Sequence, residues 1–173
     1  EGPRLAREYL QKEGIHLVIL PNLPKTYLDG AAFKARDGSP VVALTLRYDR
    51  VDHFWFTLFH ELGHVFKHLD CGDENCCYLD ELAITTDDQR EKAADRFASD
   101  NLLKDEELEE ASLFTEYSKE KVIEFAREHN VHPAIVAGRI RYKTNNYRIL
   151  WGLVGKDEVR KLFFTSFSVR RET

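Results

Sequence analysis

The sequence predicts one α+β domain, in which a small antiparallel sheet packs on two successive helices and further helices follow towards the C-terminus. Short apolar runs bounded by proline and glycine occupy the first 50 residues, as is typical of strands. Longer segments with apolar residues three or four apart follow, as is typical of amphipathic helices. At 173 residues, 43% of them apolar, the chain is long enough to bury one hydrophobic core.

The N-terminal part is expected to hold one helix and three strands. The helix begins at Pro3, a position where proline is favoured, and ends before Gly14. The turn residues of segment 37–40 separate the second strand from the third, so these two strands are expected to form a hairpin. The three strands are expected at residues 16–20, 31–35 and 41–47.

The next segment is an apolar helix that carries the pentapeptide HExxH at residues 60–64, with Asp52 as its expected N-cap. Because residues four apart lie on one face of a helix, His60 and His64 can direct both imidazoles at one point. Zinc is bound by such a pair. Glu61 lies about 100° further round the helix, where it can deprotonate a water held at that point.

Other interpretations of this helix are less favourable. The two histidines could be hydrogen-bonded core residues, but burying Glu61 beside them without partners would be costly, and a metal ion removes that cost. His68 is not expected to be a third ligand, because three histidines on consecutive turns span about 11 Å. Asp70 stands where some zinc sites have their third ligand, but Lys67 occupies the position of the glycine that would turn the chain.

A second helix supplies a better third ligand. Segment 86–89 has the form of a capping box, and the helix is expected to run to about Leu103. Its inward stripe is otherwise small and apolar but begins with Glu91, and a carboxylate in that place needs a cation. Asp95, one turn further on, could accept a hydrogen bond from the far nitrogen of a ligating histidine. It could instead form an exposed ion pair with Arg96 or Lys92.

Two motifs at matching spacing, FHELGH at 59–64 and EKAADRFA at 91–98, resemble the ImmA/IrrE metallopeptidase family. Segments 27–33, 44–49 and 135–139 add to the likeness, which covers roughly residues 3–150. More narrowly, the chain is similar to the peptidase-like domain that follows an Xre-type helix-turn-helix in some bacterial regulators and antitoxin-like proteins.

This resemblance implies a site and a role. The site would be zinc bound by His60, His64 and Glu91, with Glu61 as the general base. The role would be bacterial, in switching transcription during stress responses or in toxin–antitoxin pairs, often by cutting a repressor. The resemblance thus agrees with the ligands that the spacing of the histidines and the position of the glutamate favour.

The segment between the two ligand-bearing helices contains all three cysteines, Cys71, Cys76 and Cys77. An odd number at close spacing is unlike a secreted disulfide framework, so reduced thiols are the first expectation. A redox switch, through a disulfide or a thiolate that caps the zinc, is a second interpretation. A second metal site is a third, although the spacing matches no common zinc finger.

Two further helices are expected at residues 118–130 and 133–143. Together they resemble a helix-turn-helix, and residues 117–148 hold seven Lys or Arg against three Glu. This segment either binds DNA or closes the base of the metal site, and the family resemblance favours the second role. His132 and Arg139 are then candidates to face the cleft and to stabilise an oxyanion.

Residues 1–150 are expected to form the zincin-like metallopeptidase domain. Residues 151–173 would then be a C-terminal extension that packs on it or is partly loose. Around this boundary, residues 148–154 are expected to form a strand and residues 157–164 a helix.

Composition excludes several classes of protein. The net charge of −5 argues against broad binding to a phosphate backbone, so DNA contact is expected only through a domain upstream of residue 1. The sequence shows neither an apolar stretch of 18 residues nor a signal-peptide pattern, so we expect a cytoplasmic protein with no membrane span. The chain contains no methionine, and we expect it to be part of a longer protein.

The leading hypothesis is a zinc-dependent endopeptidase that acts on a regulatory protein such as a transcriptional repressor. An edge strand, expected at residues 41–47, would hold the substrate extended by backbone pairing. The alternative is a non-proteolytic zinc-containing sensor or interaction domain of a helix-turn-helix transcription regulator or antitoxin. Glu61 favours catalysis, because a purely structural zinc site needs no base and leaves no open coordination position.

Overall fold

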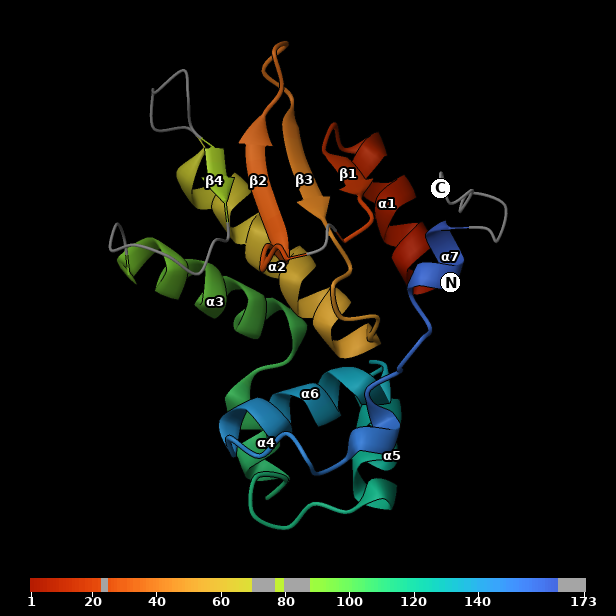
Figure 1. Ribbon diagram of the computed structural model, residues 1–173. Coiled ribbons are helices and arrows are strands. Elements are labelled where there is room, and N and C mark those ends of the chain that lie inside the picture. Colours follow the sequence, from red (N-terminus) through yellow and green to blue (C-terminus); the bar gives the residue numbers. More distant parts are fainter. Residues whose placement is uncertain (23–24, 70–76, 80–87, 165–173) are drawn as a thin grey trace.

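In the computed structural model, a four-stranded sheet and the helices packed on it lie above a layer of further helices (Figure 1). The structure describes residues 1–22, 25–69, 77–79 and 88–164. In chain order the elements are α1 (Gly2–Lys12), β1 (His16–Ile19), β2 (Gly30–Lys34), β3 (Pro40–Leu44), α2 (Val51–His68), β4 (Cys77–Leu79), α3 (Asp88–Leu102), α4 (Asp105–Glu110), α5 (Lys119–Glu128), α6 (Pro133–Lys143), η1 (Trp151–Leu153) and α7 (Arg160–Phe163).

The expected hairpin is present, and the α+β class is confirmed. β2 and β3 pair antiparallel, from Gly30 opposite Leu44 to Lys34 opposite Pro40. The turn between them places Gly38 at a φ of 85°, a left-handed conformation that glycine adopts without strain. The sheet is mixed rather than wholly antiparallel, because β1 pairs with β3 in parallel and not with its sequence neighbour β2.

The strand order β1-β3-β2-β4 corrects one expectation. The third strand, expected to be an edge that could bind a substrate, is central and pairs with both β1 and β2. Its backbone N–H and C=O groups are therefore already hydrogen-bonded to β1 and β2. Within the described residues, the edges of the sheet are β1 on one side and β4 on the other.

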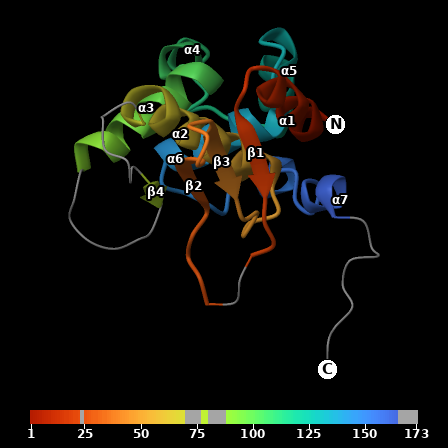
Figure 2. The same ribbon diagram turned by 90° about the horizontal axis from the view of Figure 1, so that it is seen from above.

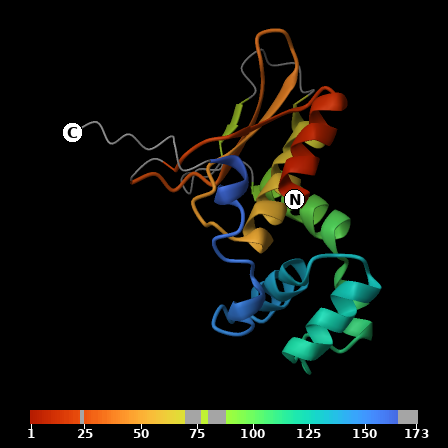
Figure 3. The same ribbon diagram turned by 90° about the vertical axis from the view of Figure 1, so that its right-hand side faces the viewer.

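Two apolar clusters form the core, and α2 contributes to the larger one. That cluster joins α1, the sheet, α2 and α7 through residues such as Leu10, Val42 and Leu58. Figure 3 shows α1 and α2 on the same side of the sheet. The second cluster lies among the end of α3 and helices α4, α5 and α6, around residues such as Leu108 and Ile140. The first turns of α2 rest on α6, so this helix connects the two layers.

Several helix ends agree with the sequence. Ser118 caps α5 by accepting a hydrogen bond from the Lys121 backbone N–H at 3.2 Å, and Pro133 opens α6. The start of α2 is different, because Arg50 holds the N-cap position with extended backbone. Asp52 instead lies buried in the first turn, where its Oδ1 accepts from Arg50 Nε at 2.9 Å.

The C-terminal part departs further from expectation. The strand expected at 148–154 is a turn followed by the short 3-10 helix η1, because Leu150 has a φ of 51°, which interrupts an extended backbone. The expected helix at 157–164 shortens to α7, which packs beside α1 through a 2.6 Å hydrogen bond from Arg4 Nε to the Leu162 carbonyl. The tail 165–173 and residues 86–87 of the expected capping box lie outside the described residues.

Helices α2 and α3 lie side by side in Figures 1 and 2, and glycine sets their separation. A Cβ placed on Gly63 would lie 3.0 Å from Cα of Ala94 and 3.2 Å from Cβ of Phe97. Ala94 and Ala98 are fully buried in the same interface. Small residues at the crossing therefore let the two backbones approach closely.

We expect Gly63→Val to destabilise the fold by about 1–3 kcal/mol, because the added side chain would overpack the α2–α3 contact. Chemical denaturation of this variant, of a control variant and of the parent measures the free energy of unfolding. The control is Gly152→Val, since a Cβ there meets nothing within 4 Å. It should stay within about 0.5 kcal/mol of the parent. Equal stability of the two variants would contradict the close crossing.

Candidate metal centre

Helix α2 presents His60 and His64 on the face that packs against α3. Both side chains are buried, and their ring centroids lie 4.8 Å apart. Helix α3 brings Glu91 to the same place from the opposite side, at the rim, with its side chain 49% exposed. The i,i+4 spacing within α2 and the close crossing with α3 therefore bring together three side chains that could hold a metal ion.

The distances between the three donor atoms suit a tetrahedral ion. His60 Nε2 lies 3.1 Å from His64 Nε2 and 3.2 Å from Glu91 Oε2, and His64 Nε2 lies 3.4 Å from Glu91 Oε1. Ligands at zinc bond lengths of 2.0–2.1 Å in a tetrahedron are about 3.3 Å apart. Two imidazoles and a carboxylate also form a donor set that zinc accepts. The residues present therefore fit such an ion.

The far nitrogen of each histidine has a partner of its own. His60 Nδ1 lies 2.9 Å from Asp95 Oδ1, so the imidazole N–H can donate to this carboxylate. His64 Nδ1 lies 3.1 Å from His68 Nδ1. Such contacts orient a metal-ligating imidazole and leave Nε2 unprotonated to bind the ion.

His68 is the residue at this site that sequence reasoning missed. The spacing excludes it as a ligand of the same ion, and the structure places it behind His64 instead. The sequence does contain a signal for this contact, because His68 follows His64 by one helical turn and the two imidazoles therefore lie on the same face of α2.

Glu61 is fully buried next to the donor cluster, between α2 and the start of β2. A Cβ on Gly30 would come within 2.8 Å of Cγ of Glu61, so only glycine leaves room for this side chain. The sheet thus holds the carboxylate in position through a residue whose role the sequence alone did not reveal.

Burial controls the protonation of His64. Removal from water, with smaller contributions from His60 and His68, lowers the pKa of His64 from 6.5 to about 3. The imidazole is therefore neutral at ordinary pH, which is the form that binds metal.

The two other residues expected near the cleft, His132 and Arg139, belong to the start and the middle of α6. His132 is exposed and caps α6, where its Nδ1 accepts from the Ala134 backbone N–H at 3.1 Å. Arg139 donates from Nε to Asp105 Oδ1 at 2.7 Å. It also lines a cavity between α2, α3 and α6. Helix α6 packs on α2, and the role of His132 and Arg139 in stabilising an oxyanion stays a prediction. Cys71 and Cys76 lie outside the described residues, as does the side chain of Cys77.

Comparison with protein families matches residues 10–141 to the IrrE N-terminal-like domain, a family of peptidases. The chain belongs to this family. The family is one of metallopeptidase-type domains, as the sequence motifs indicated, and His60, His64 and Glu91 form a group that could hold a metal ion. A search of curated proteins finds no match. Among the described residues, no helix is long and apolar enough to cross a membrane.

We expect about one metal ion per chain, bound through His60, His64 and Glu91. His64→Ala and Glu91→Ala should each sharply reduce the metal content, because each removes one of three converging donors. Elemental analysis of the purified variants measures this. Asp100→Ala, an exposed change on α3, should keep the metal of the parent. Full metal content in both ligand variants would place the site elsewhere.

The metal-free protein should lose stability as the pH falls below 6.5 towards 3. In this range the unfolded chain protonates His64 while the folded chain does not, so acid favours unfolding. One such group contributes a slope of at most about 1.4 kcal/mol per pH unit. Denaturation of chelator-treated protein across this range should show a shallower slope for His64→Gln than for the exposed control His16→Gln. Identical slopes would refute the assignment.

Proposed function

We propose that this chain is a zinc-dependent endopeptidase that cleaves a regulatory protein such as a transcriptional repressor. The observation that carries the proposal is Glu61. A carboxylate that is fully buried directly beside His60 is more than a structural site needs. Three protein donors also leave one position of a tetrahedral ion for water or substrate, which is the arrangement of catalytic zinc sites.

In the proposed reaction, the metal ion and the side chains of the protein have separate roles. Bound zinc would polarise the scissile carbonyl and lower the pKa of the attacking water. Glu61 would accept the proton of this water on its carboxylate and pass it to the leaving amine nitrogen. Asp95 and His68 would keep the two imidazoles in the orientation that the three donor atoms require.

The substrate would bind along the sheet. β4 pairs with β2 on one side, and within the described residues its other side faces no strand. β2 itself begins at Gly30, beside Glu61. An extended peptide that pairs with the free edge of β4 would therefore lie on the side of the sheet nearest the proposed base. A repressor as substrate would place the reaction in the cytoplasm, with DNA contact left to a domain upstream of residue 1.

Glu61→Gln tests the proposal. This change should keep the metal and the fold but lower the rate of peptide cleavage about 10²–10⁴-fold, because it removes only the base. The assay incubates metal-loaded protein with candidate repressors and with a peptide library and follows cleavage by mass spectrometry. Glu124→Gln, an exposed change on α5, serves as the matched control and should cleave like the parent.

Two results would contradict the proposal. One is equal cleavage by the parent and Glu61→Gln. The other is absence of any cut while Glu61→Gln still complements a deletion of the gene in cells. The second result would favour the alternative, a non-proteolytic zinc-containing sensor or interaction domain.

A further inference from the structure

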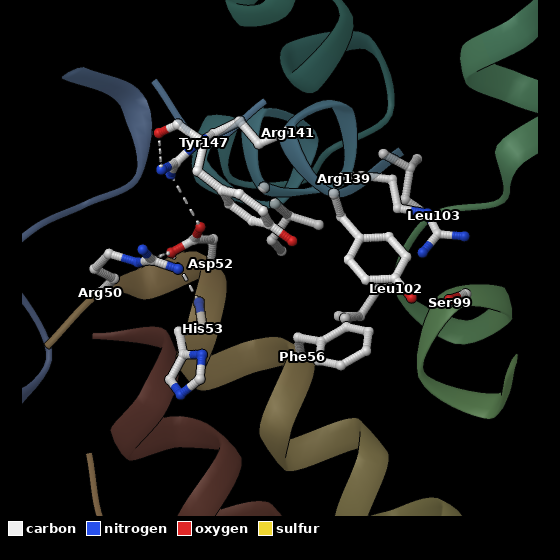
Figure 4. Close-up of a pocket in the computed structure, with 13 residues that line it drawn as sticks. Arg50, Asp52, His53, Phe56, Ser99, Leu102, Leu103, Arg139, Arg141 and Tyr147 are labelled. Carbon is white, nitrogen blue, oxygen red and sulfur yellow. Dashed lines mark hydrogen bonds and ion pairs between the residues drawn. The ribbon is translucent and has the colours of Figure 1, made fainter. Parts of the chain in front are cut away.

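A cavity of about 240 Å³ lies between α2, α3 and α6, where the two layers of the molecule meet (Figure 4). Its lining is mostly apolar and comes from all three helices, with Phe56 of α2, Leu102 of α3 and Ile135 of α6 among the side chains. An apolar cavity of about 150 Å³ can stay free of water and bind benzene. This cavity is therefore large enough for a molecule with a second ring.

The cavity is separate from the candidate metal centre. His60, His64 and Glu91, all within the described part of the chain, do not line it. The nearest connection runs through α2, where Phe56 lies one turn before His60 and the centroids of their rings are 6.3 Å apart. The cavity and the metal centre thus share helices but no side chains.

One end of the cavity holds three charged side chains that are bound to one another or to nearby groups (Figure 4). Asp52 Oδ1 accepts from Arg50 Nε at 2.9 Å, and Asp52 Oδ2 lies 3.6 Å from Arg141 Nη1. Arg141 is only 1% exposed, its Nη2 donates to the Tyr147 carbonyl at 2.6 Å, and its guanidinium lies 5.1 Å from the centre of the Trp151 ring. These charges are therefore compensated within the protein.

The other ionisable groups of the wall are paired in the same way. Arg139 donates from Nε to Asp105 Oδ1 at 2.7 Å, and His53 Nε2 lies 3.5 Å from Asp29 Oδ1. A charged ligand would lose its hydration in the cavity without gaining a free partner of opposite charge, and that loss is costly. The cavity therefore favours an uncharged ligand.

Aromatic side chains in the wall favour a flat ligand. Phe56 of α2 and Tyr142 of α6 both line the cavity, and their rings lie 6.4 Å apart between centroids with planes inclined by 29°. Aromatic rings attract further rings in offset or edge-to-face arrangements at about 4.5–7 Å between centroids. Tyr142 and Tyr147 are 55% and 52% exposed, so the cavity reaches the surface beside their rings. A planar aromatic molecule can therefore enter there and pack against these rings.

Ser99 of α3 supplies a hydrogen-bond acceptor in the wall, beside Leu102 and Leu103 (Figure 4). Its Oγ donates its proton to the Asp95 carbonyl at 2.8 Å. A hydroxyl oxygen that donates in this way keeps its lone pairs, which accept hydrogen bonds. A ligand with an N–H or O–H group can therefore bond to Ser99 without displacing the existing contact.

We propose that this cavity binds a small uncharged molecule of two fused aromatic rings that carries one N–H or O–H donor. Its rings would contact the apolar walls at Phe56, Leu102 and Ile135, and its donor would bond to Ser99 Oγ. Because the ligand would touch α2, α3 and α6 at once, it would stabilise the contact between the two layers. The proposal is independent of the proposed peptidase function, since no group of the metal centre takes part.

Indole and benzoate are the probes, added to the full chain as purified. They have the same number of non-hydrogen atoms, but only benzoate is charged. Methyl NMR signals of Leu102, Leu103 and Ile135 report occupancy of the cavity, and those of Val42 in the sheet serve as a reference. We expect indole to shift the cavity signals but not the reference, with a Kd below about 1 mM, and benzoate to bind at least about tenfold more weakly. Absence of shifts, equal binding of benzoate, or equal shifts at Val42 would overturn the proposal.

Substitutions locate the ligand. Ile135→Phe should fill the cavity and weaken indole binding at least about tenfold, whereas Ile123→Phe, at a 42% exposed position on α5, should bind like the parent. If Ile135→Phe fails to fold, as its NMR spectrum would reveal, Leu102→Phe replaces it with the same expectation. Ser99→Ala should weaken indole binding about 2–10-fold, because it removes one hydrogen bond. Unchanged binding in a folded variant with a filled cavity, or in Ser99→Ala, would overturn the site.

Discussion

The close contact of α2 and α3 is the constraint on which the rest of this structure depends. Gly63, with Ala94 opposite, allows the two helices to approach closely enough for Glu91 to reach the histidines of α2. A larger residue at the crossing would separate the donors beyond the distance that one ion can span. The same contact buries His60 and His64, and polar groups in such a place require strong partners. Packing and metal chemistry are therefore two consequences of one interface.

Helix α2 divides into two functional parts along its length. Its C-terminal half lies against the sheet, where Gly30 makes room for Glu61, and carries the donor cluster. Its N-terminal half rests on α6, where Asp52 and Arg141 meet close to Gly138, whose Cβ position would lie 2.7 Å from Cβ of Asp52. One rigid element therefore holds the donor cluster and the proposed base at fixed positions, as an active site would need.

The parts of the account that sequence predicted are those with a local cause. The histidine pair follows from helical periodicity, and Glu91 stood out because a carboxylate began an otherwise apolar stripe. The parallel pairing of β1 with β3 and the central place of β3 could not be predicted, because strand partners far apart in sequence are chosen by packing. The same applies to His132 and Arg139, whose direction depends on where α6 meets α2.

X-ray absorption spectroscopy of the metal-loaded protein tests the central claim most directly. If α2 and α3 together hold one zinc ion, its first shell contains only nitrogen and oxygen at about 2.0–2.2 Å, with the outer-shell scattering of two imidazoles. A sulfur shell at about 2.3 Å without the scattering of two imidazoles would contradict the account, because it would mean that cysteines, rather than the helix crossing, hold the metal.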